Sequence, residues 1–193
     1  MKYHLSRIVD GHHVSIEEFT TILARASATL NSRPLTPISN SPDDFGALTP
    51  FHFLTLCALR VPVERDLTEL KNKSNRWQLV QQMTQHLFKR WSSQYLQTLQ
   101  HKYKWLDLNQ NIRVGTMVLV HQLDSSVGPQ RWRLGRVDAV FPGLDGRVRI
   151  VDVRVPGPTA DGTGPSFKIL RRPITCLSPL PLDEALTNAH ARL

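Results

Sequence analysis

The sequence has little cysteine and no long apolar run, and each absence excludes a class of protein. Its two cysteines, Cys57 and Cys176, lie far apart without a CxxC pair, so neither a disulfide framework nor a four-ligand zinc site is supported. We expect both to be buried thiols. No apolar run reaches the roughly 18 residues that span a membrane, and the N-terminus MKYHLSRIVDG does not resemble a signal peptide. We therefore expect a soluble, intracellular chain with no membrane partner.

Catalytic motifs are missing as well. No glycine-rich phosphate loop follows an apolar strand, and no local motif supplies a Ser/His/Asp or Cys/His set. His4, His12 and His13 have no cysteine near them, so we interpret them as surface residues rather than zinc ligands. We expect no enzymatic activity, no catalytic residue, no metal and no cofactor.

Positive charge is in excess, and it is unevenly placed. Residues 1–75 carry eight basic and eight acidic side chains, whereas residues 76–180 carry fifteen basic and six acidic. This asymmetry favours a polyanionic partner, and nucleic acid rather than a membrane, because no basic amphipathic membrane helix is evident. The alternative is that the charge only keeps the chain soluble.

Two helices are predicted from their periodicity. Ser15 and Glu18 form a capping box that opens a helix over 15–31. The stretch from Trp77 to Trp105 has an apolar residue every three or four positions and no proline or glycine, which predicts a longer helix. We expect its tryptophan seam to pack against a core or to mediate self-association. The opposite face, with Gln82 and Ser92 among its residues, is expected to face solvent or a phosphate backbone.

Short β-strands are predicted in the region that follows. The turn dipeptides Pro142-Gly143 and Asp145-Gly146 separate two apolar runs and indicate a hairpin. Five short strands in succession favour a small SH3-like β-barrel. The apolar runs are 113–122, 134–141, 148–155, 166–170 and 174–177.

Arginines of this region are the candidate binding residues. The strand period of two places Arg147 and Arg149 on one face, and Arg131 and Arg133 likewise. If those strands are neighbours, one basic surface results, and it would bind the phosphates of nucleic acid, duplex DNA in the first place, with little sequence preference. The predicted nucleic-acid-binding residues are Arg131, Arg133, Arg136, Arg147, Arg149, Arg171 and Arg172.

Several stretches together resemble the integrase region of Pao/BEL-type long-terminal-repeat retrotransposon polyproteins. The resemblance covers about Lys2 to Pro181 and implies the end of an RNase-H-like catalytic core, followed by the associated C-terminal domain of unknown function. The stretches that carry it are LNSRPLTPISNSPDDFGALTPFHFL, NRWQLVQQMTQHLFKRWSSQYLQTLQ, RVGTMVLV, WRLGRVDAVFPGLDGRVRIVDVR and RRPITCLSPLP.

The resemblance also implies a chemistry that this chain does not carry. Integrases of this type use three carboxylates that hold two divalent metal ions, and no acidic residue here matches any of the three. The last of them would lie on a helix just before residue 1, and Phe51 stands where the family usually has a glycine. We therefore expect a fragment of a degraded or domesticated element that binds nucleic acid without cutting it. It would be nuclear if it acts as an integrase-derived protein.

An α+β fold with five regions follows from these expectations. The alternative function is a protein–protein or chromatin interaction module, in which an aromatic cage grips a methylated lysine. Trp132, Phe141 and Phe167 are few and scattered for such a cage. The expected regions are a truncated catalytic-core remnant over 1–60, a linker over 61–75, a long amphipathic helix over 76–110, the barrel over 111–181 and a disordered tail over 182–193.

Overall fold

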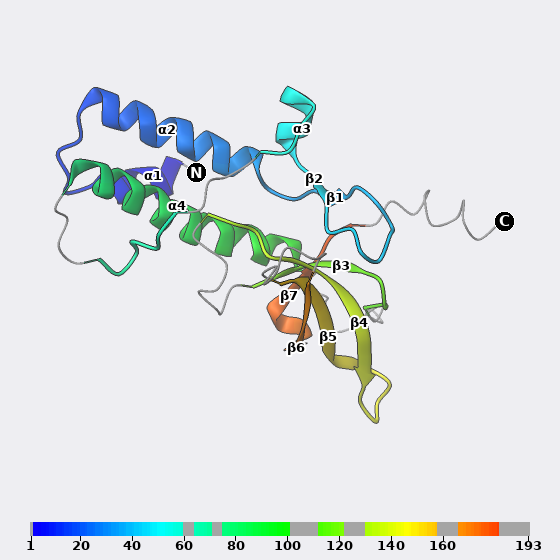
Figure 1. The fold of residues 1–193 in the computed structure, drawn as a ribbon. Coiled ribbons are helices and arrows are strands. Elements are labelled where there is room, and N and C mark those ends of the chain that lie inside the picture. Colours follow the sequence, from blue (N-terminus) through cyan, green and yellow to red (C-terminus); the bar gives the residue numbers. More distant parts are fainter. Residues whose placement is uncertain are drawn as a thin grey trace. The chain divides into compact units, whose positions relative to one another are not determined.

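The computed structural model describes residues 2–59, 64–70, 75–100, 112–121, 130–157 and 166–181. Helices and an antiparallel sheet are both present (Figure 1), so the predicted α+β class is confirmed. The helices are α1 (Lys2–Val9), α2 (Ile16–Asn31), α3 (Pro50–Thr55), α4 (Arg76–Leu99) and the 3-10 helix η1 (Ile174–Cys176). The strands are β1 (Thr36–Pro37), β2 (Ala47–Leu48), β3 (Met117–Val120), β4 (Leu134–Pro142), β5 (Val148–Pro156), β6 (Phe167–Pro173) and β7 (Leu177–Pro179).

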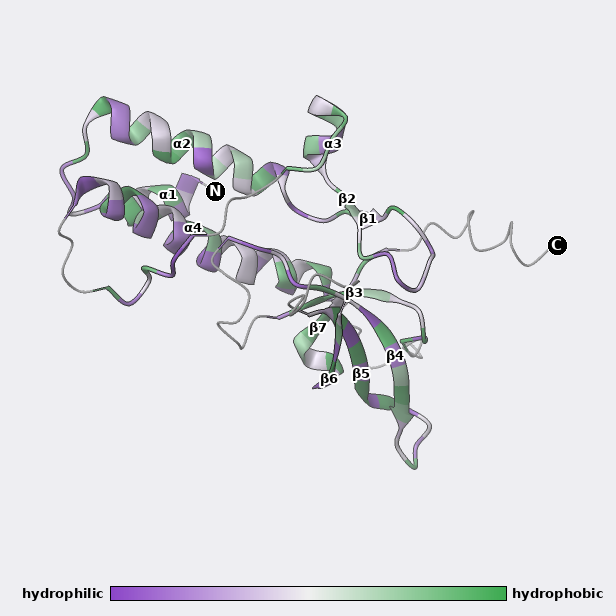
Figure 2. Cartoon of the chain, in the orientation of Figure 1, coloured by the Kyte–Doolittle hydropathy of each residue, from purple (hydrophilic) through white to green (hydrophobic). Residues whose placement is uncertain are grey.

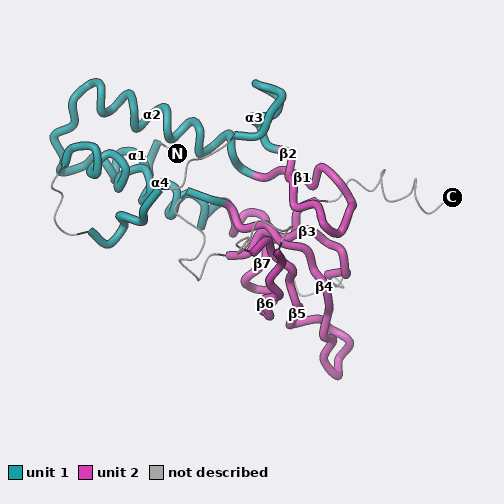
Figure 3. The backbone as a smooth tube through the Cα atoms, in the orientation of Figure 1, with its two compact units in different colours: residues 1–33, 49–95, 123–131 teal, residues 34–48, 96–122, 132–193 magenta. Residues whose placement is uncertain are grey.

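The chain divides into two compact units, coloured in Figure 3. Unit 1 contains Met1–Arg33, Thr49–Tyr95 and Leu123–Arg131. Unit 2 contains Pro34–Leu48, Leu96–Gln122 and Trp132–Leu193. The proline-rich segment that precedes α3 therefore belongs with the five-stranded sheet, and the last residues of α4 belong there too. The predicted tail over 182–193 and the end of the predicted long helix, with Trp105, lie outside the described residues.

Helix α2 begins at the predicted capping box. The Ser15 hydroxyl accepts the Glu18 N–H at 3.3 Å, and the Glu18 carboxylate accepts the Ser15 N–H at 2.9 Å. These two bonds satisfy donors that the first turn of a helix otherwise leaves without partners. The apolar core of unit 1 forms where α1, α2 and α4 meet, and it consists of Ile8, Ile22, Ala26, Leu79, Val80, Met83 and Leu87.

Helix α4 buries two residues, Gln82 and Ser92, on the face that was predicted to be solvated. Gln82 is buried, and its side-chain amide donates to the carbonyls of Leu67 and Leu70 at 2.8 and 3.0 Å. Gln85 is buried beside it, accepts the Leu67 N–H at 2.8 Å and donates to Arg65 O at 2.9 Å. The prediction for Gln82 is wrong, because these amides supply hydrogen-bond partners to an irregular backbone segment.

Unit 2 contains a five-stranded antiparallel sheet in the order β6-β5-β4-β3-β7. The first strand, β3, pairs with the last, β7, while η1 carries the chain from β6 at one edge to β7 at the other. β6 and β7 do not pair with each other in the described residues, so the sheet is not a closed barrel. Its core consists of Val118, Val120, Val137, Val148, Val151, Val153, Val155, Leu170 and Leu177.

Strand β5 shows why this sheet has one buried face. Val151, Val153 and Val155 are buried while Asp152 and Arg154 between them are half-buried, and Figure 2 shows hydrophobic and hydrophilic residues following one another along the strand. This is the period of two that strand geometry imposes. The register shifts between Phe141 and Pro142, where Arg149 has no partner in the ladder.

Gly135 on β4 allows close packing against β5. A Cβ at this position would lie 2.5 Å from a methyl group of Val153 and 2.9 Å from Arg154 O. Only glycine fits this approach without displacing the neighbouring strand.

Three predictions can be compared with the structure. His4, expected at the surface, is buried, and its Nε2 lies 2.7 Å from Gln94 Oε1, so that prediction is wrong for His4. Cys57 is exposed and Cys176 is half-buried, so the prediction of buried thiols is wrong for Cys57, which follows the end of α3. Among the described residues, no helix is both long and apolar enough to cross a membrane.

Candidate nucleic-acid interface

The outer face of the five-stranded sheet, opposite the valine core, holds most of the candidate residues. The register of β4, β5 and β6 arranges this face in rows across the three strands. The rows are Arg136, Arg154 and Ile169; then Ala139, Asp152 and Arg171; and then Phe141, Ile150 and Pro173.

Arg136, one of the predicted binding residues, is used inside the protein. It is 3 % exposed. Its guanidinium donates to Asp44 O and Gly115 O, both at 3.0 Å, and to Ser39 O. Burial lowers the pKa of this group, although an arginine stays charged at neutral pH. Arg136 therefore holds backbone carbonyls, and the sequence prediction that it faces a phosphate does not fit this geometry.

A segment of residues 39–46, here called the strap, lies over the first row. Arg154 binds it with an ion pair to Asp43 at 3.1 Å and a hydrogen bond to Pro42 O at 2.8 Å. The Arg154 guanidinium also lies 5.2 Å from the centroid of the Phe167 ring, which packs against Phe45 at 5.8 Å. Sequence reasoning did not identify the strap, because its partners lie more than 90 residues away along the chain.

The other end of the outer face stays exposed, and we call it the hairpin patch. It surrounds the β4–β5 turn, where Gly143 N–H donates to Arg147 O at 2.8 Å and Gly146 takes a positive φ of 71°. A positive φ favours glycine, which the Asp145-Gly146 dipeptide supplies at residue 146. The hairpin patch consists of Phe141, Leu144, Arg147, Arg149, Ile150 and Arg171, all exposed.

Two of the three arginines in the hairpin patch hold a carboxylate. Arg149 binds Asp145 at 2.6 Å, and Arg171 binds both oxygens of Asp152 at 2.8 and 2.9 Å. The hydrogen bond from each arginine lowers the pKa of its carboxyl group, so both pairs are ionised at neutral pH. In the described residues no acidic partner of the Arg147 side chain is found.

Aromatic surface accompanies these charges. The Arg171 guanidinium lies 4.5 Å from the centroid of the Phe141 ring, which is a cation–π distance. Phe141 and Ile150 face each other across β4 and β5 and are 40 % and 44 % exposed. The patch can therefore offer guanidinium donors beside an apolar surface.

The remaining predicted residues do not join the hairpin patch. Arg172 pairs with Val151 of the core face, and its Nη1 donates to Arg171 O at 3.0 Å. Arg133 is half-buried just before β4, and Arg131 belongs to unit 1. The six predicted arginines of unit 2 thus form no single surface; Arg147 and Arg149 lie at the β4–β5 turn, and Arg171 reaches Phe141 near the end of β4.

Metal ligands are not gathered in the part of the chain that the structure describes, where no three His, Cys, Asp or Glu side chains could hold an ion together. The described residues of unit 2 contain nine Lys or Arg and five Asp or Glu. The described residues of unit 2 therefore carry an excess of positive charge.

Comparison with known proteins gives one family. The sequence model of a family described as "Family of unknown function (DUF5641)" matches residues 75–180, which run from the start of α4 to the end of β7. This is more than half of the chain. No curated protein and no solved structure gives a significant match.

Proposed function

The chain belongs to the DUF5641 family of unknown function, and we propose that it is a nucleic-acid-binding module without catalytic activity of its own. The observation that carries this proposal is the hairpin patch, where Arg147 and Arg149 are exposed at the β4–β5 turn and the exposed Arg171 places its guanidinium over the Phe141 ring. Guanidinium groups are preferred partners of phosphate oxygens, because their planar N–H groups bind two oxygens at once.

The sheet of unit 2 supports this proposal through its topology. Its first strand pairs with its last, and a 3-10 turn links the two strands at opposite edges. We propose that this is an SH3-like barrel that remains open between β6 and β7. In such a sheet the β4–β5 hairpin projects beyond the core, as Figure 1 shows for this chain, and so its arginines can reach a phosphate backbone.

The parent of the module is proposed from sequence resemblance. The stretches that resemble the Pao/BEL integrase region include α4, β3, β4 and β5, and the family match spans the same elements. We propose that the chain is a fragment of such an integrase that lacks the carboxylate triad, from a degraded or domesticated element. It would then contact the DNA backbone but not cleave it, because a two-metal site needs its bridging carboxylates.

Binding through phosphates makes a specific expectation about sequence preference. Phosphate contacts position a protein and carry no base information, so two unrelated duplexes should bind alike, with a Kd of roughly micromolar or weaker at physiological salt. Fluorescence anisotropy of the full chain with two fluorescein-labelled duplexes of equal length tests this. No binding at low salt would refute the proposal, and cleavage with magnesium or manganese would refute its non-catalytic part.

A second candidate is a protein or chromatin interaction module, favoured by the exposed Phe141, Leu144 and Ile150. Against an aromatic cage, the rings of Phe141 and Phe167 each hold an arginine of the same chain. Self-association through the long helix also stays a proposal. In the described part of its apolar face, Val80, Met83 and Leu87 are buried in the core of unit 1, whereas Trp91 is half-buried and Trp77 is 48 % exposed.

A further inference from the structure

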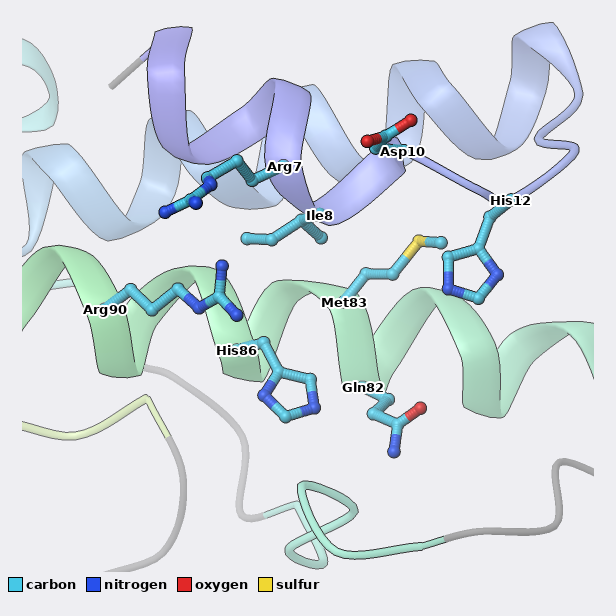
Figure 4. A pocket seen from close by; sticks show the side chains of 8 residues that line it. All are labelled: Arg7, Ile8, Asp10, His12, Gln82, Met83, His86 and Arg90. Carbon is cyan, nitrogen blue, oxygen red and sulfur yellow. The ribbon is translucent and has the colours of Figure 1, made fainter.

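A cavity in unit 1, apart from the hairpin patch, carries an inference that does not depend on nucleic-acid binding. It lies between α1 and α4 and has a volume of about 190 Å³ (Figure 4). Arg7 and Ile8 of α1 and His12 after it line one side, and Met83, His86 and Arg90 of α4 line the other. A cavity of this volume has room for a small ligand rather than for a single water molecule.

The lining is strongly basic. Two guanidinium groups, Arg7 and Arg90, and two imidazoles, His12 and His86, contribute to it, against one carboxylate, Asp10. Figure 4 shows the Asp10 carboxylate directed away from Arg90 and His86. In the described part of unit 1 neither Arg7 nor Arg90 has an ion pair; the Arg7 guanidinium lies 5.0 Å from the centroid of the Tyr3 ring. Both charges are thus available to an anion.

The other polar neighbours are already engaged. The amide of Gln82 donates to Leu67 O and Leu70 O, so it serves the backbone rather than the cavity. The pKa of the Asp66 carboxyl group is lowered, mainly because the backbone N–H and the hydroxyl of Thr68 donate to it at 2.9 and 2.7 Å; the charges of Lys89 and His86 contribute less. The carboxylate of Asp66 is therefore already hydrogen-bonded and does not neutralise Arg7 or Arg90 by an ion pair.

Apolar side chains lie between the charged ones. Ile8 and Met83 are buried residues of the unit 1 core and form the wall between Arg90 and His12. Ile8 and Met83 are only 9 % and 3 % exposed, so the apolar surface that they present to the cavity is small, and a short carbon body is enough to cover it. The guanidinium groups of Arg7 and Arg90 favour an anion, and the apolar side chains favour an anion that carries a carbon body.

We propose that this cavity binds a small organic phosphate, with the phosphate held by Arg7 and Arg90 and its short uncharged body against Ile8 and Met83. A phosphate monoester carries up to two negative charges and three acceptor oxygens, and two arginines facing one site match both. The cavity is too small for the drug-sized ligands that occupy pockets of roughly 300 Å³ or more. A compound of the size of glycerol 3-phosphate fits it.

The test is a titration of the full ¹⁵N-labelled chain with glycerol 3-phosphate, followed by NMR, with glycerol as the uncharged comparison. We expect saturable shifts at amides of α1 and α4 around the cavity, and none with glycerol. Arg90→Gln and, separately, Arg7→Gln should each weaken affinity about tenfold, because each removes a charge-assisted hydrogen bond. Lys89→Gln is the matched control: it removes one exposed charge beside Arg90 without lining the cavity, and affinity should change by less than about twofold.

Three results would overturn the proposal. The first is a set of NMR shifts that grow without saturation. The second is an equal loss of affinity in Lys89→Gln and Arg90→Gln. Both would indicate an unspecific electrostatic attraction of the phosphate. The third comes from titrating the variants with a DNA duplex. If Arg90→Gln weakened duplex binding about as much as loss of Arg147 and Arg149 does, the cavity would belong to the nucleic-acid surface rather than to a small ligand.

Discussion

Arg136 and Arg154 lie directly opposite each other across β4 and β5, and both bind the strap of residues 39–46. Like charges opposite each other in a sheet repel. Here the backbone carbonyls of Ser39, Pro42 and Asp44 and the carboxylate of Asp43 surround the two guanidinium groups. The pair therefore fixes a segment that is distant in sequence onto the outer face, and under the proposed function phosphate contact falls to the arginines of the hairpin patch.

Replacing Arg136 should cost stability rather than binding. Arg136→Gln removes donors from three carbonyls in a buried position, and we expect the free energy of unfolding to fall by about 2–4 kcal/mol. Arg147→Gln, an exposed change, should alter it by less than about 0.5 kcal/mol. Urea unfolding monitored by circular dichroism measures both. Equal stability of the two variants would show that Arg136 does not hold the strap.

The buried amide of Gln85 should be needed for the stability of unit 1. Gln85→Leu leaves Leu67 N–H and Arg65 O without their side-chain partner, so we expect a loss of about 2–3 kcal/mol. Gln97→Leu, at an exposed position of the same helix, is the matched control and should have little effect. Thermal unfolding of both variants compares them directly, and an unchanged midpoint for Gln85→Leu would contradict the assigned hydrogen bonds.

His121 should make stability depend on pH. The Ser178 hydroxyl donates its proton to Leu96 O at 2.9 Å. His121 Nε2 lies 2.9 Å from the same hydroxyl oxygen, so this nitrogen must carry a proton and donate to Ser178. Burial lowers the pKa of His121, and the unfolded chain therefore binds the second ring proton, which gives the charged imidazolium, more readily than the folded chain does. The stabilising contribution is complete above the unfolded pKa of about 6.5 and is lost as pH falls from there through the folded pKa.

The corresponding experiment measures the free energy of unfolding between about pH 7.5 and pH 5 for the wild type and for His121→Gln. Glutamine keeps an N–H donor but does not titrate. We expect the variant to lose less stability over this range. Parallel curves for the two proteins would show that His121 titrates alike in the folded and unfolded chains.

Local features of this fold were predictable from sequence, and features that depend on distant contacts were not. The capping box at Ser15, the hairpin at Pro142-Gly143 and the period of β5 each arise from neighbouring residues. The burial of Arg136 could not be predicted, because its acceptors Ser39 and Asp44 lie 97 and 92 residues away. The burial of Gln82 could not be predicted either, because the carbonyls that it binds, Leu67 O and Leu70 O, belong to a segment outside helix α4.

The candidate site was predicted in part. Arg147 and Arg149 do come together, although by a turn and a register shift rather than by simple alternation. Arg171 joins them through its row with Asp152 and Ala139, whereas its neighbour Arg172 pairs with a core residue. Sequence spacing therefore located the arginines but did not determine which face each would occupy.

The salt dependence of DNA binding tests the central proposal most directly. The measurement is fluorescence anisotropy with a labelled duplex over a series of salt concentrations, comparing the wild type with Arg147→Ala/Arg149→Ala. The control Lys2→Ala/Lys89→Ala removes the same charge from exposed positions of unit 1. We predict that the hairpin-patch variant binds more weakly and flattens the slope of log K against log salt by about two phosphates' worth, while the control keeps the wild-type slope. An absence of binding at low salt, or one slope for all three proteins, would contradict the proposal and leave the arginines a solubilising role.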